Sequence, residues 1–161
     1  GLILVLGLGL LLWLTGWFGG GAAGARFESN GEQIYFTATS QSGTPVTAVT
    51  GPGMGRMRGS ELSCASCHGP DGRGGQVRMM MRIIEVPDIR YDALTAEEHG
   101  EHGEEGQEGE EGHEPYNEET IKRAITEGIE PGGEPLDWPM PRWSMSDEDL
   151  DDLVEFLKTL D

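Results

Sequence analysis

The stretch SCASCHGPDGRGG, residues 63–75, decides the fold because it contains the only two cysteines of this 161-residue chain. Cys64 and Cys67 are three residues apart, and His68 follows the second cysteine directly. Residues three apart lie on one face of a helix, so both sulfur atoms face the same object. His68 lies one residue further round, where its imidazole reaches beneath a flat ligand. We therefore predict one or two helical turns over 61–68, ended by the glycines of 69–75.

The C-x-x-C-H spacing is typical of haem c attachment, with two thioether bonds from the cysteines and the histidine as proximal iron ligand. Three other interpretations stay open. A structural zinc site needs two further ligands, and His99 with His102 is the nearest pair. A thiol–disulfide redox pair follows a strand in a βαβ unit, a pattern that is missing around these residues. A disulfide between Cys64 and Cys67 would close only a very small loop.

The charge of the chain excludes one class of partner. The formal net charge is −18 at pH 7, so a nucleic-acid backbone would repel the protein. Basic residues concentrate between positions 56 and 90, and most acidic residues lie from Asp92 onward. This asymmetry predicts a basic patch around one site within an acidic surface, or simply two solvated faces.

The chain divides into two predicted domains. Residues 1–25 carry no charge, and 2–18 are almost wholly apolar, close to the length that spans a bilayer core. We predict that residues 1–25 form a transmembrane anchor in the lipid bilayer with a glycine-rich tether. A signal peptide cleaved after the small residues at 23–25 is the alternative. Residues 26–161 form the second domain, with an insert over 97–115 in which glycine recurs every third position from Gly100 to Gly112 among glutamates.

Elements of the second domain follow from caps and periodicity. Asn30 begins a short helical turn. Residues 35–40 and 46–50 are β-branched and aromatic around a Ser42-Gly43 turn, which favours a small hairpin or an extended loop after that turn. Asn117 caps a helix that ends near Gly128. Ser146 caps a final helix whose core-facing stripe repeats every three to four residues: Leu150, Leu153, Val154, Leu157 and Leu160.

Three segments resemble the class I c-type cytochromes: NGEQIYF at 30–36, ETIKRAITEGI at 119–129 and WPMPRWSMSDEDLDDLVEFLKTL at 138–160. The resemblance implies an all-α class I cytochrome c fold, of short helices around one covalent haem, over about residues 30–160. It makes Met140 the distal axial ligand, with Met145 as the fallback. Tyr35 and Phe156 then mark the crossing of the N- and C-terminal helices.

The same resemblance implies partners for the haem. The sequence VPDIRY at 86–91 is similar to the family segment whose proline carbonyl accepts the second N–H of the ligating histidine, which makes Pro87 the candidate. Arginine suits the haem propionates because of its bidentate fork, and Arg73, Arg82 or Arg90 are candidates. Trp138 or Trp143 is the matching aromatic candidate, for a propionate contact or for plain packing in the haem pocket.

Function is expected to follow from the ligation. With His68 and Met140 both bound, the iron can pass single electrons but has no open position for a substrate, so no catalysis is expected from this chain alone. The expected protein is a membrane-anchored monohaem cytochrome c on the periplasmic face of a bacterial inner membrane. Its partners would be redox proteins and other subunits of a complex.

The parent complex is a finer question. The segments IYFTATSQSGTP and SCASCHGPDGRGG look most like the monohaem subunit of alternative complex III, a quinol-oxidising respiratory or photosynthetic complex. A haem c subunit of a terminal oxidase or nitric oxide reductase is an alternative. A haem-based sensor or peroxidase with a labile distal methionine is another, and a metal-binding membrane protein is the third.

Overall fold

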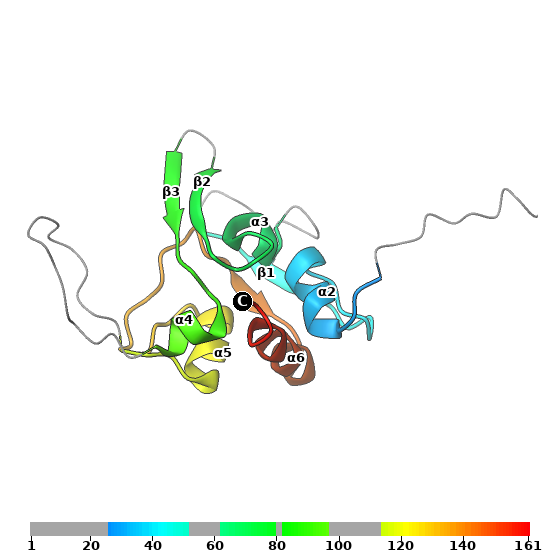
Figure 1. The fold of residues 1–161 in the computed structure, drawn as a ribbon. Coiled ribbons are helices and arrows are strands. Elements are labelled where there is room, and N and C mark those ends of the chain that lie inside the picture. The colour runs from blue at the N-terminus through cyan, green and yellow to red at the C-terminus, as the bar shows by residue number, and fades with distance from the viewer. Residues whose placement is uncertain (1–25, 52–61, 80–81, 97–113) are drawn as a thin grey trace, which may run out of the picture.

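The computed structural model describes residues 26–51, 62–79, 82–96 and 114–161 (Figure 1). Five short helices and four short strands lie in these ranges, so the expectation of an all-α chain was wrong in this respect. They are, in chain order, α2 (Asn30–Thr37), β1 (Thr47–Val49), α3 (Cys64–His68), β2 (Gly75–Met79), β3 (Arg82–Val86), α4 (Tyr91–Thr95), α5 (Glu118–Thr126), β4 (Arg142–Ser144) and α6 (Asp147–Leu157).

Two predicted features fall largely outside these ranges. The anchor and tether at 1–25 and residues 97–113 of the acidic insert are not among the described residues. Within the described ranges, none of the helices combines the length and the apolar character that a membrane crossing requires.

Helix α2 is longer than its sequence suggests. It begins at Asn30, as predicted, and Ser29 is its N-cap, because the Ser29 Oγ accepts the N–H of Glu32 at 3.0 Å. The helix continues through Thr37, so the prediction of a strand over 35–40 was wrong. Ile34 and Tyr35 are buried on its inner face, and this tertiary contact outweighs their preference for strands.

The crossing of α2 and α6 is the centre of the fold, as Figure 1 shows. The rings of Tyr35 and Phe156 lie 5.2 Å apart at this crossing, which confirms the predicted contact. Gly31 lets the two backbones approach, since a Cβ there would overlap the carbonyl of Asp152. The buried core comprises Ile34, Tyr35, Ala38, Ala48, Ile121, Ile125, Trp143, Leu150, Leu153, Val154 and Leu157.

Strand β1 pairs with β4 in an antiparallel two-stranded sheet, with Ala48 opposite Trp143. The predicted hairpin between 35–40 and 46–50 is therefore wrong. The partner of β1 lies near the other end of the chain, and local sequence carries no signal for such a pairing. Burial of the Ala48 and Trp143 side chains in the core supplies the driving force.

Strands β2 and β3 form an antiparallel hairpin that the sequence reading did not anticipate. Its register runs from Gly75 opposite Val86 at the base to Met79 opposite Arg82. In Figure 1 the hairpin projects from the helical body. The β-branched residues Ile83, Ile84 and Val86 of β3 are the strand signal that this segment carries.

Helices α5 and α6 begin as predicted. The side chain of Asn117 accepts the N–H of Thr120, and the hydroxyl of Thr120 accepts the N–H of Asn117, which completes a capping box. Ser146 accepts the N–H of Asp149. The stripe on α6 is buried from Leu150 to Leu157, and Leu160 is half-buried just beyond the helix.

The carboxylate of Asp149 joins three parts of the chain. It accepts hydrogen bonds from Asn30 at 2.9 Å, Ser40 at 2.5 Å and Ser146 at 2.7 Å, and a further one from Thr44. We call these five residues the Asp149 cluster. Burial alone would raise the pKa of Asp149, but hydrogen bonds from Ser40, Thr44, Asn30 and Ser146 hold it well below its ordinary range. The cluster thus ties the start of α2 and the loop at 40–44 to the start of α6.

Candidate functional site

Helix α3 presents both cysteines one turn apart, as predicted. The Oγ of Ser66 accepts the N–H of Ser63 at 3.2 Å and donates to its carbonyl at 2.6 Å, which closes the first turn. Both cysteines are free thiols and half-buried. Burial raises the pKa of the Cys64 thiol to about 12, with a smaller effect from Cys67. Thiol–disulfide exchange requires a thiolate, and the raised pKa disfavours a thiolate at Cys64.

His68 is buried and held in one orientation. Its side chain is 7% exposed, and its Nδ1 lies 3.0 Å from the carbonyl oxygen of Pro87. A carbonyl only accepts, so Nδ1 carries the proton and Nε2 keeps its lone pair. Burial lowers the pKa of His68, which favours this neutral form although the Pro87 contact acts in the opposite direction. Among the described residues, none hydrogen-bonds Nε2, which leaves that nitrogen available to a metal.

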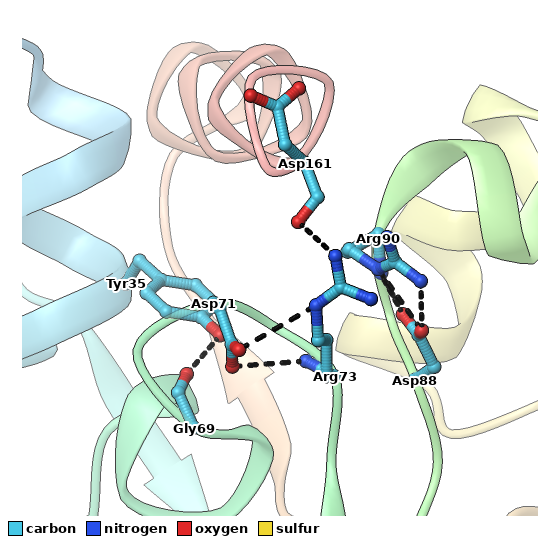
Figure 2. Close-up of polar contacts among 7 residues, drawn as sticks. All are labelled: Tyr35, Gly69, Asp71, Arg73, Asp88, Arg90 and Asp161. Carbon is cyan, nitrogen blue, oxygen red and sulfur yellow. Dashed lines mark hydrogen bonds and ion pairs between the residues drawn. The ribbon is translucent and has the colours of Figure 1, made fainter.

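The loop after α3 fixes the Pro87 carbonyl. Gly74 has a φ of +68°, and its N–H donates to the carbonyl of His68 at 2.9 Å. A Cβ on Gly74 would lie 2.5 Å from the oxygen of Pro87, so any side chain there would displace the acceptor of His68. Tyr35 holds the other end of the loop, because its hydroxyl donates to the carbonyl of Gly69 at 2.6 Å (Figure 2).

Arg73 lies within this loop and Arg90 lies just before α4, and each has a partner (Figure 2). Arg73 lies 3.6 Å from the carboxylate of Asp71 and donates to the carbonyl of Asp161 at 2.9 Å. Arg90 holds Asp88 in a bidentate pair whose shortest contact is 2.6 Å, and this pair lowers the pKa of Asp88. Arg73 is thus placed beside the end of α6, and its predicted role at a haem propionate stays a prediction.

The predicted distal ligand lies in a tight loop before β4. Met140 is half-buried against the hydrophobic core, and its N–H donates to the carbonyl of Asp137 at 3.1 Å. Met145 also packs against the core, between β4 and α6. Met79 is half-buried on β2, while Met54, Met57, Met80 and Met81 lie outside the described residues.

The two candidate tryptophans have different surroundings. Trp143 is 7% exposed and forms part of the hydrophobic core from β4. Trp138 is 47% exposed, and the guanidinium carbon of Arg142 lies 4.9 Å from the centre of its ring. The place of Trp143 in the core agrees with the packing role that the sequence analysis offered as an alternative. A contact between either tryptophan and a haem propionate stays a prediction.

A zinc site that includes these cysteines finds no additional support among the residues that the structure describes. Within the described ranges, no three histidine, cysteine, aspartate or glutamate side chains gather as metal ligands would. His99, His102 and His113, which the zinc interpretation needs, fall outside those ranges.

Sequence reasoning missed two residues near the site. Tyr35 was assigned only to the helix crossing, although its hydroxyl also anchors Gly69. Arg142 was quoted within the segment at 138–160 but given no role. Its position two residues after Met140, between a proline and a tryptophan, was the available signal.

The comparisons with known proteins agree with this geometry. The family model described as cytochrome c matches residues 28–161, which is most of the chain. Searches of curated proteins and of solved structures found no significant match. The donor set fits a covalent haem, since two free thiols lie one turn apart and the adjacent imidazole keeps Nε2 available. The chain belongs to the cytochrome c family, with haem c attached covalently through Cys64 and Cys67.

Proposed function

We propose that this cytochrome c carries single electrons, with His68 and Met140 as the two axial ligands of its haem iron. The observation that carries the proposal is the hydrogen bond from Nδ1 of His68 to the Pro87 carbonyl at 3.0 Å. A ligating histidine normally uses its other nitrogen in this way, and the bond raises its basicity as a ligand.

The haem supplies a one-electron iron couple when bound. His68 provides an imidazole whose rotation is blocked by its burial and by the Pro87 carbonyl. Met140 provides a thioether, which favours the reduced state. Two protein ligands leave no open position for oxygen or another substrate, so electron transfer without bond-making chemistry is the function these residues support best.

Visible and near-infrared spectra test the ligand set. The wild-type protein, matured with export intact, is expected to show the sharp α-band of haem c and the weak sulfur-to-iron band of a methionine ligand. Met140→Leu is expected to abolish the sulfur band and keep the α-band, because both thioether bonds remain. Met145→Leu is the matched control and is expected to keep both bands, since Met145 packs against the core.

Other outcomes would assign the site differently. Loss of the sulfur band in Met145→Leu but not in Met140→Leu would transfer the ligand role to Met145. A wild-type α-band without any sulfur band would remove methionine from the iron and favour a sensor or peroxidase. Absence of haem absorption would contradict the attachment itself.

We further propose that residues 1–25 anchor the protein and that it works as a subunit of a quinol-oxidising complex on the periplasmic face. The uncharged, apolar run at 2–18 supports the anchor. Haem c is attached after export, which supports the outer face. The acidic insert at 97–115 offers a surface for other subunits, and its charge favours basic ones.

Membrane fractionation tests this second part. The haem-bearing full chain is expected to remain with membranes after a high-salt wash and to leave them only in detergent, because apolar insertion is insensitive to salt. In mild detergent it is expected to co-purify with stoichiometric subunits that support quinol oxidation. Release by salt alone would contradict the anchor, and purification as a single chain would contradict the complex.

A further inference from the structure

Arg142, in β4, makes an unusual set of contacts around the methionine loop. Its Nη1 donates to the carbonyl of Met140 at 2.6 Å, and its Nη2 donates to the carbonyl of Leu136. These two carbonyls bracket residues 136–140. The same guanidinium lies 4.9 Å from the centre of the Trp138 ring, in the middle of that segment. One side chain therefore holds both ends and the centre of the loop that presents Met140.

The opposite side of Arg142 is held by α5 and the turn after it. Gly128 has a φ of +68°, and a Cβ there would overlap the Nε of Arg142. The turn thus leaves space for the guanidinium only because residue 128 is glycine. The stem of Arg142 therefore lies directly against the backbone of residue 128, so one side chain contacts both the turn after α5 and the methionine loop.

The guanidinium of Arg142 is held by backbone carbonyls and not by a carboxylate of the described residues. Among the described residues, no carboxylate forms an ion pair with it, and its hydrogen-bond acceptors are two backbone carbonyls. Arg73 and Arg90 differ in this respect, because Asp71 and Asp88 neutralise them. Arg142 is also half-buried, so water screens its charge less than that of an exposed arginine.

We propose that Arg142 is a positioning residue that holds the thioether of Met140 on the haem iron and favours the reduced state through its positive charge, which no described carboxylate neutralises. This rests on the proposed function, in which Met140 is the axial ligand. Oxidised iron carries one more positive charge than reduced iron, so a fixed cation near it destabilises the oxidised state. Holding the methionine loop requires arginine. Only its planar guanidinium can donate to two carbonyls and also lie over an aromatic ring.

Two substitutions separate position from charge in the haem-loaded full chain. Arg142→Gln removes the charge and most of the fork. We expect the equilibrium constant for reduction to fall at least tenfold, which is about 59 mV for one electron, and the sulfur-to-iron band to weaken. Arg142→Lys keeps the charge but cannot donate to both carbonyls. Its equilibrium constant for reduction is expected to stay within twofold of the wild-type value. Its sulfur-to-iron band is expected to disappear at a lower temperature than that of the wild type.

Arg123→Gln is the matched control. Arg123, in α5, also donates to two backbone carbonyls of the following turn, those of Glu130 at 2.6 Å and Pro131 at 3.1 Å, but it does not contact residues 136–140 through any described hydrogen bond. Its loss is expected to lower the midpoint of thermal unfolding and leave the potential and the sulfur band unchanged. A purely structural role for Arg142 would give this same pattern in Arg142→Gln.

The outcomes separate this proposal from the ligand assignment. If the wild type has a sulfur band that depends on Met140, and Arg142→Gln keeps both band and potential, the proposal fails while the ligand assignment holds. If Met140→Leu keeps the band, the ligand assignment fails and this proposal falls with it. If Arg142→Gln does not accumulate as folded protein, Arg142→Lys decides, since a band as heat-resistant as that of the wild type would remove the positioning role.

Discussion

Gly31→Ala is expected to lower the free energy of unfolding of the haem-loaded protein by about 4 kcal/mol or more, which most single substitutions do not reach. The new Cβ would overlap the carbonyl oxygen of Asp152 and lie 2.6 Å from its carbonyl carbon. Both are backbone atoms of α6, so no rotamer change relieves the contact. Helix α2 must move away from α6, which opens the core around Ile34 and Leu153.

The sign of this effect is informative, because helix propensity alone predicts the opposite. Alanine at a free helical position is more stable than glycine by about 1 kcal/mol. Urea unfolding followed by haem absorbance measures the difference, together with the yield of haem-loaded protein. Gly132→Ala is the control, and a change within about 0.5 kcal/mol is expected there, since the nearest atom to its Cβ is the mobile carboxylate end of Glu134. Equal stability of Gly31→Ala and the wild type would contradict the close crossing of α2 and α6.

Asp149→Ala is expected to lower the free energy of unfolding by about 3 kcal/mol at pH 7. The substitution leaves the donors of Asn30, Ser40, Thr44 and Ser146 without their shared acceptor, and the Ser40 donor is itself buried. Asp149 itself is 1% exposed, so water cannot replace the carboxylate without a local opening.

The pH dependence of this loss has a definite sign. The hydrogen bonds of the Asp149 cluster hold the pKa of Asp149 below its ordinary value in the folded protein. A carboxylate of this kind contributes stability that is fully present above its unfolded pKa of about 4 and is lost as the pH falls toward its folded pKa. The difference in unfolding free energy between wild type and Asp149→Ala is therefore expected to be constant from pH 7 to about pH 5 and to shrink below about pH 4.

Asp147→Ala provides the matched control for helix electrostatics. Asp147 lies in the same first turn of α6 but is exposed. Its removal forfeits only the interaction with the helix dipole, about 0.3–1 kcal/mol. Urea titrations of the three proteins at several pH values measure both effects. A loss in Asp149→Ala no greater than that in Asp147→Ala would mean that the cluster contributes little beyond the dipole.

Local chemistry made helices α5 and α6 predictable. Caps such as Asn117 and Ser146 act within three residues, and the apolar stripe on α6 repeats with the helical period. Both features can therefore be recognised from a short segment of sequence. The spacing of Cys64, Cys67 and His68 is equally local, and the family match supports the haem that it indicates. The resemblance of residues 86–91 to a cytochrome c segment predicted the Pro87 carbonyl as the acceptor for His68. The structure places that carbonyl at hydrogen-bond distance from His68.

The remaining features depend on contacts between distant segments. The pairing of β1 with β4 joins residues from opposite ends of the domain, so the pattern at 46–50 indicated a strand but not its partner. Nothing in the local sequence around Ser40 and Thr44 indicates a contact with Asp149, and only the fold brings them together. Arg142 was hidden for the same reason, because its role arises from where Leu136 and Gly128 lie in space.

The β2–β3 hairpin separates His68 from Pro87 along the chain but not in space. At its base, Gly75 lies opposite Val86, and Gly74 is held against the carbonyl of His68. The geometry between the imidazole and its acceptor is therefore set below the hairpin and is independent of how far the strands extend above it. Such a junction isolates the metal chemistry from changes in loop length. The part of the hairpin beyond Gly75 and Val86 can therefore change in length by one residue in each strand, or change in sequence, while the hydrogen bond between His68 and Pro87 is preserved.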